Sequence, residues 1–408
     1  MTRPHPREVR AELAPLVHGE LDDDRAWRLY AVHTWSCLIE PGDGVAGRIV
    51  SALGPEAALD QVVRADSDPG VLNAAGITPR EWQEGLDRWR PRLKRSAVQD
   101  ALEVARRSGI SVITPEDAQW PAALTDLGHH APLLLWVRGD VDTLSRLSPS
   151  IALVGARAAT GYGEHIAIEM AAELVGRGVS IVSGAAYGID GAAHRAALAA
   201  GGITVALLAG GVDRPYPAGH ANLIERIAGS GAVVSEVPCA TTPTKWRFLQ
   251  RNRLIAALAD ATVVVEAGWR SGSLNTAGHA AALSRPLGAV PGPVTSAASA
   301  GCHRLLREFD ARCVTNADEV LELLGGPSPA LFDLPVEGSD SGRGRTDDVT
   351  RVLDAMSFRA WREVTDIARR CGLAPADVMA ILGLLAVEGA ATRSDSGWRR
   401  ARQAVPSG

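Results

Sequence analysis

Residues 179–194 read VSIVSGAAYGIDGAAH, an apolar run of strand length that ends in a glycine-rich turn and continues into a helix-forming stretch. The same order of buried strand, turn and helix recurs on both sides of this segment. Near-continuous apolar strands of this kind are typical of a parallel sheet whose two faces are covered by helices. The sequence therefore predicts an α/β fold, with parallel strands at 151–154, 179–182, 204–208, 232–234, 262–265 and 287–290.

The flanking sequence differs from this pattern. Two short runs, 110–113 and 133–137, have strand composition and lead into the sheet, whereas 8–90 carries helical apolar spacing broken by Gly and Pro. After the sheet, three helical stretches and a short β-hairpin have the outline of a winged helix. The predicted domains are an N-terminal helical domain (1–100), a sheet domain (101–325), a linker rich in Gly, Pro and Ser (326–345) and a C-terminal winged-helix domain (346–408).

The composition excludes several classes of protein. The chain has 408 residues, 46% hydrophobic and 22% charged, with a net charge of −5, which is typical of a multidomain globular protein and not of a disordered or fibrous one. No apolar run approaches the roughly 20 residues of a membrane helix, and no secretory signal is visible, so we expect a cytoplasmic protein. The five widely spaced cysteines favour neither a disulfide framework nor a zinc site, and we predict no metal and no cofactor.

The turns after the first two strands of the parallel set offer groups that bind anions. The first turn, GARAATGYG at 155–163, precedes a helix, and backbone amides at a helix start favour a phosphate. Gly155 and Arg157 are the predicted phosphate-binding residues there, and Ser183 and Gly184 are their counterparts in the second turn. The alternative is a tight structural turn with a surface arginine. A dinucleotide site is not favoured, because the first turn is not G-x-G-x-x-G.

Residues 244–253, TKWRFLQRNR, combine four cations and two aromatic residues without an acid. Closely spaced cations suit a phosphate backbone, and aromatic rings suit the faces of unpaired bases, whereas a duplex would leave Phe248 without a stacking partner. The alternative is that Trp246 and Phe248 are core residues and the arginines pair with surface acids. The binding hypothesis assigns Phe248 to base stacking and assigns phosphate contacts to Lys245, Arg251, Asn252 and Arg253.

A third donor-rich turn follows the fifth strand, where residues 269–277 read WRSGSLNTA. Its hydroxyl and amide groups would lie at the same edge of the sheet as the first two turns, because ligands of parallel sheets bind at the carboxyl ends of the strands. A row of phosphates would use all of these groups, whereas one nucleotide would not. The predicted phosphate-binding residues of this turn are Ser271, Gly272, Ser273 and Thr276.

Taken in order, these turns form a series that resembles the DprA (Smf) DNA-processing family. The series comprises V-G-x-R at 154–157, T-G-Y-G at 160–163, S-G-x-A-x-G-I-D-x-x-A-H at 183–194, G-x-D-x-x-Y-P at 211–217, R-N-R at 251–253, S-G-S-L-x-T-A at 271–277 and V-P-G at 290–292. The resemblance implies an extended Rossmann-like domain. It also implies an N-terminal helical domain of the SAM or helix-hairpin-helix sort and a C-terminal winged helix.

The resemblance further implies a function. Members of this family are non-enzymatic proteins that bind and protect single-stranded DNA in natural transformation, dimerise, and help to load the RecA recombinase. No catalytic residue is expected. By resemblance, the end of the sheet domain would supply the dimer or RecA contact, with Leu305, Leu306 and Phe309 as candidates. From helical periodicity alone, these three side chains could equally point into their own core.

A nucleotide-binding hydrolase on a related fold, such as a nucleoside monophosphate phosphoribohydrolase, is the competing hypothesis. Such enzymes resemble one another in a P-G-G-x-G-T-x-x-E turn, but residues 291–296 read PGPVTS and lack the acid and the second glycine. The sequence shows no Ser/His/Asp triad, metal cluster or paired carboxylates to replace them. For the C-terminal domain we expect little effect on DNA affinity, because its 374–388 helix carries no cation.

Overall fold

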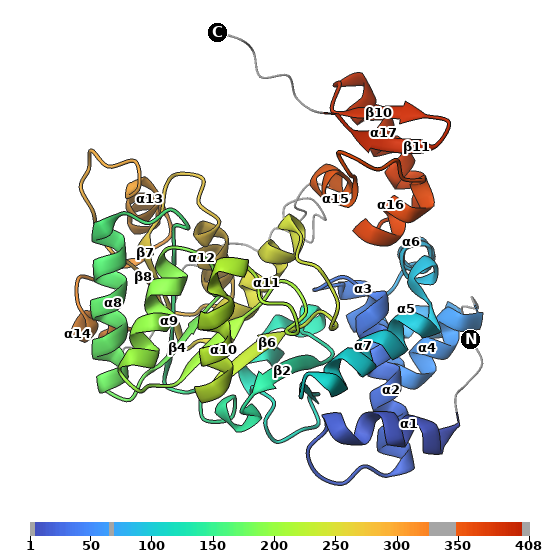
Figure 1. Cartoon of the computed structure of the whole chain (residues 1–408), viewed down its shortest axis with the longest axis horizontal. Helices are drawn as coiled ribbons and strands as arrows, with labels where there is room; N and C mark the ends of the chain where they lie inside the picture. Colours follow the sequence, from blue (N-terminus) through green and yellow to red (C-terminus); the bar gives the residue numbers. More distant parts are fainter. Residues whose placement is uncertain (1–4, 65–68, 326–347, 402–408) are drawn as a thin grey trace.

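The computed structural model describes residues 5–64, 69–325 and 348–401, so the linker predicted at 326–345 lies outside the described residues. Its largest element is a nine-stranded sheet in the order β1-β2-β6-β5-β4-β3-β7-β8-β9 (Figure 1). The strands are β1 Ser111–Ile113, β2 Leu135–Gly139, β3 Ser150–Gly155, β4 Ser180–Ser183, β5 Thr204–Leu207, β6 Ala232–Ser235, β7 Ala261–Glu266, β8 Leu287–Ala289 and β9 Arg312–Cys313.

Strands β6, β5, β4, β3, β7, β8 and β9 run parallel, and β1 and β2 add an antiparallel edge next to β6. The prediction of a mostly parallel sheet is therefore confirmed, as are the positions of its six central strands and of the two leading strands. The short edge strand β9 was not predicted, because both of its residues are exposed and carry no apolar signal. The parallel strands place the turns after β3, β4, β5, β6 and β7 at one carboxyl edge.

Helices cover both faces of the sheet, because successive apolar side chains along each strand point to opposite faces and both sets are buried. On β3, Ile151 and Leu153 pack against one layer, whereas Ala152 and Val154 pack against the other. The face of Ala152 is covered by α11 Lys245–Leu258, α12 Ser273–Ala282 and α13 Ala300–Glu308. The opposite face is covered by α8 Gly161–Gly176, α9 Ile189–Ala199, α10 Ala221–Ser230 and α14 Ala317–Gly325.

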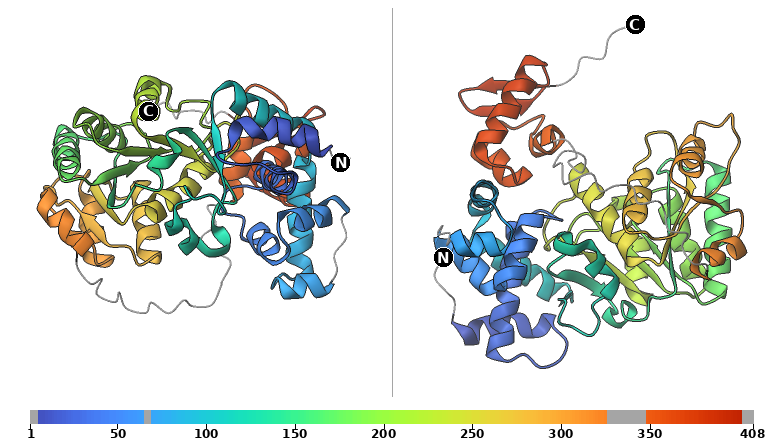
Figure 2. Two further views of the ribbon diagram at one scale, coloured as in Figure 1. Left: turned by 90° about the horizontal axis from the view of Figure 1, so that it is seen from below. Right: turned by 180° about the vertical axis from the view of Figure 1, so that it is seen from behind.

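The N-terminal region is helical (Figures 1 and 2). Its side chains contribute to two cores. One core is built around Trp35, Trp82 and Trp89, whose rings meet edge to face at 5.3 and 5.7 Å. The other joins α1 (Pro6–Leu13), α2 (Asp23–Leu38) and α7 (Arg95–Arg107) to the sheet. The boundary predicted at residue 100 falls inside α7. The helices are α1 Pro6–Leu13, α2 Asp23–Leu38, α3 Gly44–Leu53, α4 Pro55–Arg64, α5 Pro69–Ala74, α6 Pro79–Trp89 and α7 Arg95–Arg107.

Residues 348–401 form a third unit with its own apolar core. It contains α15 Asp348–Ala355, α16 Val364–Cys371, α17 Pro375–Val387 and the hairpin of β10 Ala391–Ser394 and β11 Gly397–Arg400. We refer to this unit as the C-terminal module. Five short 3-10 helices complete the described fold: η1 Ala14–Leu16, η2 Arg90–Arg92, η3 Ala122–His130, η4 Val141–Thr143 and η5 Ala218–His220.

Within the described ranges, no single helix is both long enough and apolar enough to cross a membrane. Helices α16 and α17 would pass such a test only as a pair, by length and composition, and they are bent by 106° at their junction.

Candidate nucleic-acid interface

The turn after β3 is held in place by a buried carboxylate. Glu266, at the end of β7, accepts hydrogen bonds from the backbone N–H of Thr160 (2.8 Å) and from its hydroxyl (2.7 Å). Thr160 in turn caps α8 by accepting the N–H of Gly163 at 3.2 Å. At Gly155 a Cβ would lie 2.5 Å from Ile189, so only glycine fits this close approach. The rigid turn presents Arg157 to solvent at the carboxyl edge.

Phe248 lies at the centre of an aromatic and cationic cluster on this edge. The guanidinium carbon of Arg157 is 4.6 Å from its ring centroid, and that of Arg251 is 5.7 Å away. The ring of Tyr216, from the loop after β5, is 5.5 Å from that of Phe248 and is 46% exposed. Phe248 itself is half-buried, so part of it can reach a ligand. We call Arg157, Tyr216, Phe248 and Arg251 the Phe248 cluster.

A second exposed aromatic residue lies in the turn after β4. Tyr187 is 47% exposed and packs edge to face on His220, with ring centroids 4.7 Å apart. Neither Tyr187 nor Tyr216 was among the residues predicted for the site. Their positions could have indicated this role, because each tyrosine lies in a motif turn that follows a parallel strand, where ligands of such sheets bind.

Ser183 and Gly184 are engaged within the protein. The Ser183 hydroxyl donates to the carbonyl of Leu153 at 2.6 Å, and the Gly184 N–H donates to the carboxylate of Asp190 at 3.1 Å. Both residues are buried. The helix that follows begins after Gly188, and the Asp190 carboxylate braces the turn. A phosphate would have to displace these bonds to reach either group.

Arg251 is buried at the ends of two strands. It donates to the carbonyl of Gly184 at 2.8 Å and to the carbonyl of Leu207, so it links the ends of β4 and β5. Burial lowers the pKa of Arg251 to about 10; the charge of Asp190 opposes this shift, and the charge of Arg157 adds to it. The carboxyl edge therefore holds two neighbouring guanidinium groups, of which one is buried and one is exposed.

The other two residues of the R-N-R motif face different partners. Arg253 is buried and forms an ion pair with Glu236 at 2.7 Å. Asn252 donates to the carbonyl of Gly272 at 3.3 Å and to the side chain of Asn275 at 3.2 Å. Asn252 thus fixes the turn after β7 against α11 and brings that turn beside the Phe248 cluster.

In the turn after β7, the hydroxyl groups of Ser271 and Ser273 are 2.8 Å apart. Gly272 is exposed, and nothing lies within 4 Å of a Cβ placed on it. Ser273 and Thr276 are buried in the first turn of α12. Of the four residues predicted here, Gly272 and the half-buried Ser271 are the accessible ones.

Helix α11 begins at the exposed Lys245, after the cap residue Thr244. The second cation of the 244–253 stretch, Arg247, is buried. It binds Glu40 through two nitrogens, at 2.7 and 2.9 Å, and Arg92 approaches the same carboxylate at 3.1 Å. Burial by itself would raise the pKa of Glu40, but Arg247 and Arg92 outweigh it and lower that pKa to about 2. Arg247 therefore joins the N-terminal helices to α11. It pairs with an acid, as the alternative for this cluster predicted, but that acid is buried and not at the surface.

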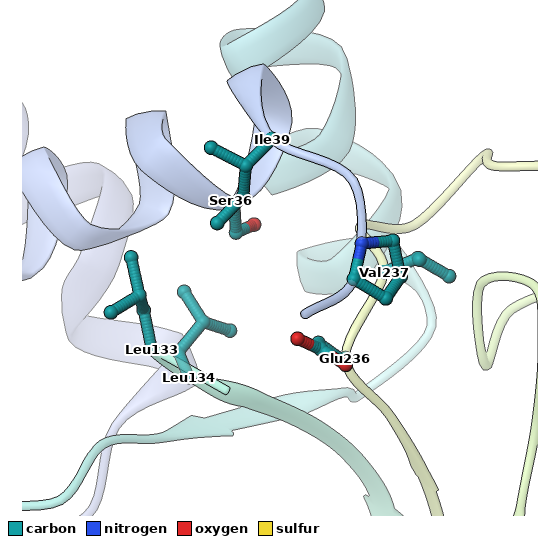
Figure 3. A pocket seen from close by; sticks show the side chains of 7 residues that line it. Ser36, Ile39, Leu133, Leu134, Glu236 and Val237 are labelled. Carbon is teal, nitrogen blue, oxygen red and sulfur yellow. The ribbon is translucent and has the colours of Figure 1, made fainter. Parts of the chain in front are cut away.

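Beside this junction lies a small pocket between the end of α2, the residues just before β2 and the loop after β6 (Figure 3). Ser36, Ile39, Leu133, Leu134 and Val237 line it, and the carboxylate of Glu236 faces it. Since Glu236 already pairs with Arg253, the pocket belongs to the packing between the N-terminal helices and the sheet.

The three residues predicted for protein contact separate into two groups. Leu305 is 1% exposed and lies in the core under the sheet, so it is not available to a partner. Leu306 and Phe309 are half-buried at the margin of that core. Nearby, the guanidinium carbon of Arg304 lies 5.3 Å from the ring of Trp269 and 5.6 Å from that of Phe309. Trp269 is 58% exposed, and we call Trp269, Arg304 and Phe309 the α13 patch.

The fold and the exposed edge define an α/β protein with a large, mostly parallel sheet, whose candidate interface is a row of cationic, aromatic and polar groups at the carboxyl ends of the strands. Residues 111–325 match the family model described as DNA recombination-mediator protein A. The chain belongs to this family, the DprA/Smf family, as the motif series predicted.

Similar proteins are found over most of the chain. A DNA processing protein DprA of Mycobacterium tuberculosis is 44% identical over 386 residues, covering 92% of this chain and 94% of that protein. Protein Smf of Escherichia coli is 33% identical over 341 residues, covering 83% and 88%. The X-ray structure of DprA from Streptococcus pneumoniae is similar with a TM-score of 0.57 and 28% identity, covering 74% of this chain and 98% of that one.

Proposed function

We propose that this protein binds single-stranded DNA along the carboxyl edge of its sheet. The observation that carries the proposal is the Phe248 cluster, in which a half-buried ring is flanked by the exposed Arg157 and by the partly exposed Tyr216. Unpaired bases stack on such rings at roughly 1–3 kcal/mol per base, and a guanidinium beside the ring can bind the adjoining phosphate. A duplex hides its base faces and would use only the cations.

In this proposal the accessible groups contact the strand, and the buried ones position them. Arg157 and Lys245 bind phosphates, Phe248 stacks a base, and Tyr187 and Tyr216 extend the stacking surface. Ser271 and Gly272 offer further donors. Arg251 and Asn252 hold the turns in register, because their side chains bond to backbone carbonyls of those turns.

The protein would act without catalysis as a recombination mediator. Membership of the family supports this role, in which the protein protects single-stranded DNA and helps to load RecA during natural transformation. The α13 patch, with Leu306, is the surface we assign to a homodimer or to the RecA contact. A cytoplasmic location, a SAM-like N-terminal domain and a winged-helix C-terminal domain belong to the same proposal.

The test compares a labelled single strand with a duplex of equal length in fluorescence anisotropy at one salt concentration. We expect the single strand to bind at least tenfold more tightly. Equal affinity for the two forms would contradict the stacking role of Phe248. Release of base or ribose from a nucleoside monophosphate by the same preparation would instead favour the hydrolase hypothesis.

A further inference from the structure

The C-terminal module touches the helix that carries the Phe248 cluster. In Figures 1 and 2, α15 lies beside the start of α11. The carboxylate of Asp354 on α15 accepts the backbone N–H of Lys245 at 2.8 Å. Within α11, the Thr244 hydroxyl accepts the N–H of Arg247 at 3.2 Å. One free amide at the helix start is therefore capped locally, and another is capped by a carboxylate from a separate module.

Two more contacts hold the module in this position. Arg351, one helical turn before Asp354, places its guanidinium carbon 4.8 Å from the ring of Trp246. Gly372, after α16, approaches the Glu40 junction so closely that a Cβ there would lie 2.8 Å from the Glu40 side chain. The module thus presents an acid to an amide donor and a cation to an aromatic face, which is a complementary interface and not a single chance contact.

This interface overlaps the DNA site that we propose. Lys245, Phe248 and Asn252 follow one another at spacings of three and four, so they share one face of α11. When a base stacks on Phe248, the phosphate next to it lies within about one helical turn of α11 from the ring. The start of α11 favours an anion there, and the Asp354 carboxylate already occupies that place.

We propose that the C-terminal module is an internal competitor of single-stranded DNA, with the Asp354 carboxylate holding the place of a phosphate at Lys245. This inference rests on the proposed function. Binding of a strand across α11 then requires α15 to move away, and contacts that hold α15 weaken DNA binding. The lack of cations in the 374–388 helix predicts little effect of the module on DNA affinity, whereas the Asp354 contact predicts inhibition.

The first test uses the full-length chain with Asp354→Ala. We expect its affinity for a labelled oligo-dT to rise about three- to tenfold, because DNA no longer has to displace a contact that stabilises about as much as one helix cap. Asp395→Ala is the matched control, because Asp395 is an exposed acid in the β10–β11 turn of the same module. The control removes the same charge without touching α11, so its affinity should stay within twofold of the wild type.

Arg351→Gln separates competition from simple electrostatics. It removes a positive charge, so electrostatics alone predicts weaker DNA binding, whereas loss of the contact with Trp246 predicts tighter binding. Because Arg351 also donates to the carbonyl of Cys371 at 2.6 Å, thermal unfolding of the variant must be measured alongside. Weaker binding by a folded Arg351→Gln protein would overturn the inference.

Hydrogen exchange of the wild type gives a readout that does not depend on any variant. On addition of saturating oligo-dT, amides of α15 should exchange faster as the module is released, while those at the start of α11 stay protected. If the wild type binds DNA but α15 exchange and the Asp354→Ala affinity are unchanged, the competition is refuted and the proposed function stands. If no variant binds DNA, both are refuted.

Discussion

Arg157 and Phe248 are 91 residues apart in the chain, yet the guanidinium carbon of Arg157 lies 4.6 Å from the centroid of the Phe248 ring. One comes from the turn after β3, and the other from the first turn of α11. The pair brings a phosphate-binding group and a base-stacking group to one point on the carboxyl edge. In a single strand, phosphates and bases alternate at a spacing that allows one nucleotide to contact Arg157 and Phe248 together.

The Phe248 ring should contribute stacking, which an aliphatic side chain cannot replace. We expect Phe248→Leu to weaken single-strand binding by roughly 1–3 kcal/mol, about five- to 150-fold, and Phe248→Trp to keep affinity near that of the wild type. Anisotropy with labelled oligo-dT measures both, and thermal unfolding checks that they are folded. If the leucine variant binds as tightly as the wild type, Phe248 acts only as an apolar spacer.

Arg157 and Lys245 should each account for one phosphate. Arg157→Ala and Lys245→Ala are expected to weaken binding to all sequences and to reduce the slope of log affinity against log salt by about 0.7 each. Arg177→Ala is a suitable control, because Arg177 is exposed at the end of α8, on the opposite edge of the sheet. Unchanged slopes in both test variants would remove these residues from the interface.

How far the sequence could predict this site is clearest in the 244–253 stretch. Its charges favoured a solvated cationic cluster, and Lys245 and the half-buried Phe248 do lie at the surface. Arg247 and Arg253 are instead buried against Glu40 and Glu236. No local pattern reveals such pairs, because Glu40 lies 207 residues from Arg247 and Glu236 belongs to another loop.

The fold shows the same division between local and distant information. Apolar runs predicted the central strands, because burial on both faces of a parallel sheet leaves a continuous signal. The packing of α7 on the sheet was missed, since its buried residues Val98, Leu102 and Ala105 also fit a separate helical domain. Which surface a helix faces is a tertiary property that its own periodicity does not contain.

Glu40 should be needed for stability more than for DNA contact. Glu40→Gln leaves Arg247 and Arg92 buried without a carboxylate, and we expect the free energy of unfolding to fall by about 3–5 kcal/mol. Denaturant titration measures this change. Glu84→Gln, at the exposed pair of Arg80 and Glu84, should leave the midpoint unchanged. Equal effects of the two substitutions would contradict the role of the buried junction.

The α13 patch offers a test of the proposed homodimer. Trp269 and Phe309 are accessible without disturbing Leu305, so Trp269→Ser with Phe309→Ser should convert a dimer to a folded monomer. Light scattering at tens of micromolar measures the mass, and exposed Val294→Ser serves as the control, with no expected change. A wild-type monomer at that concentration would overturn the dimer, and a dimeric double variant would move its interface elsewhere.

The last prediction concerns pH. His33 and His194 are fully buried; burial lowers their pKa values to about 4 and about 3, and for His194 the charges of His220 and Arg251 add to the shift. The unfolded chain takes up these protons near pH 6.5, whereas the folded chain does not, so protons favour unfolding as the pH falls below 6.5. Between pH 8 and 5 each histidine should lower the free energy of unfolding by about 2 kcal/mol. His33→Phe keeps a ring against Trp136, which meets His33 edge to face at 4.9 Å, and should remove the contribution of His33, about 2 kcal/mol, from the measured pH dependence. Denaturant titrations of the wild type and the variant at pH 8, 6.5 and 5 measure it, and identical pH dependence in the two would show that His33 is protonated without cost in the folded protein.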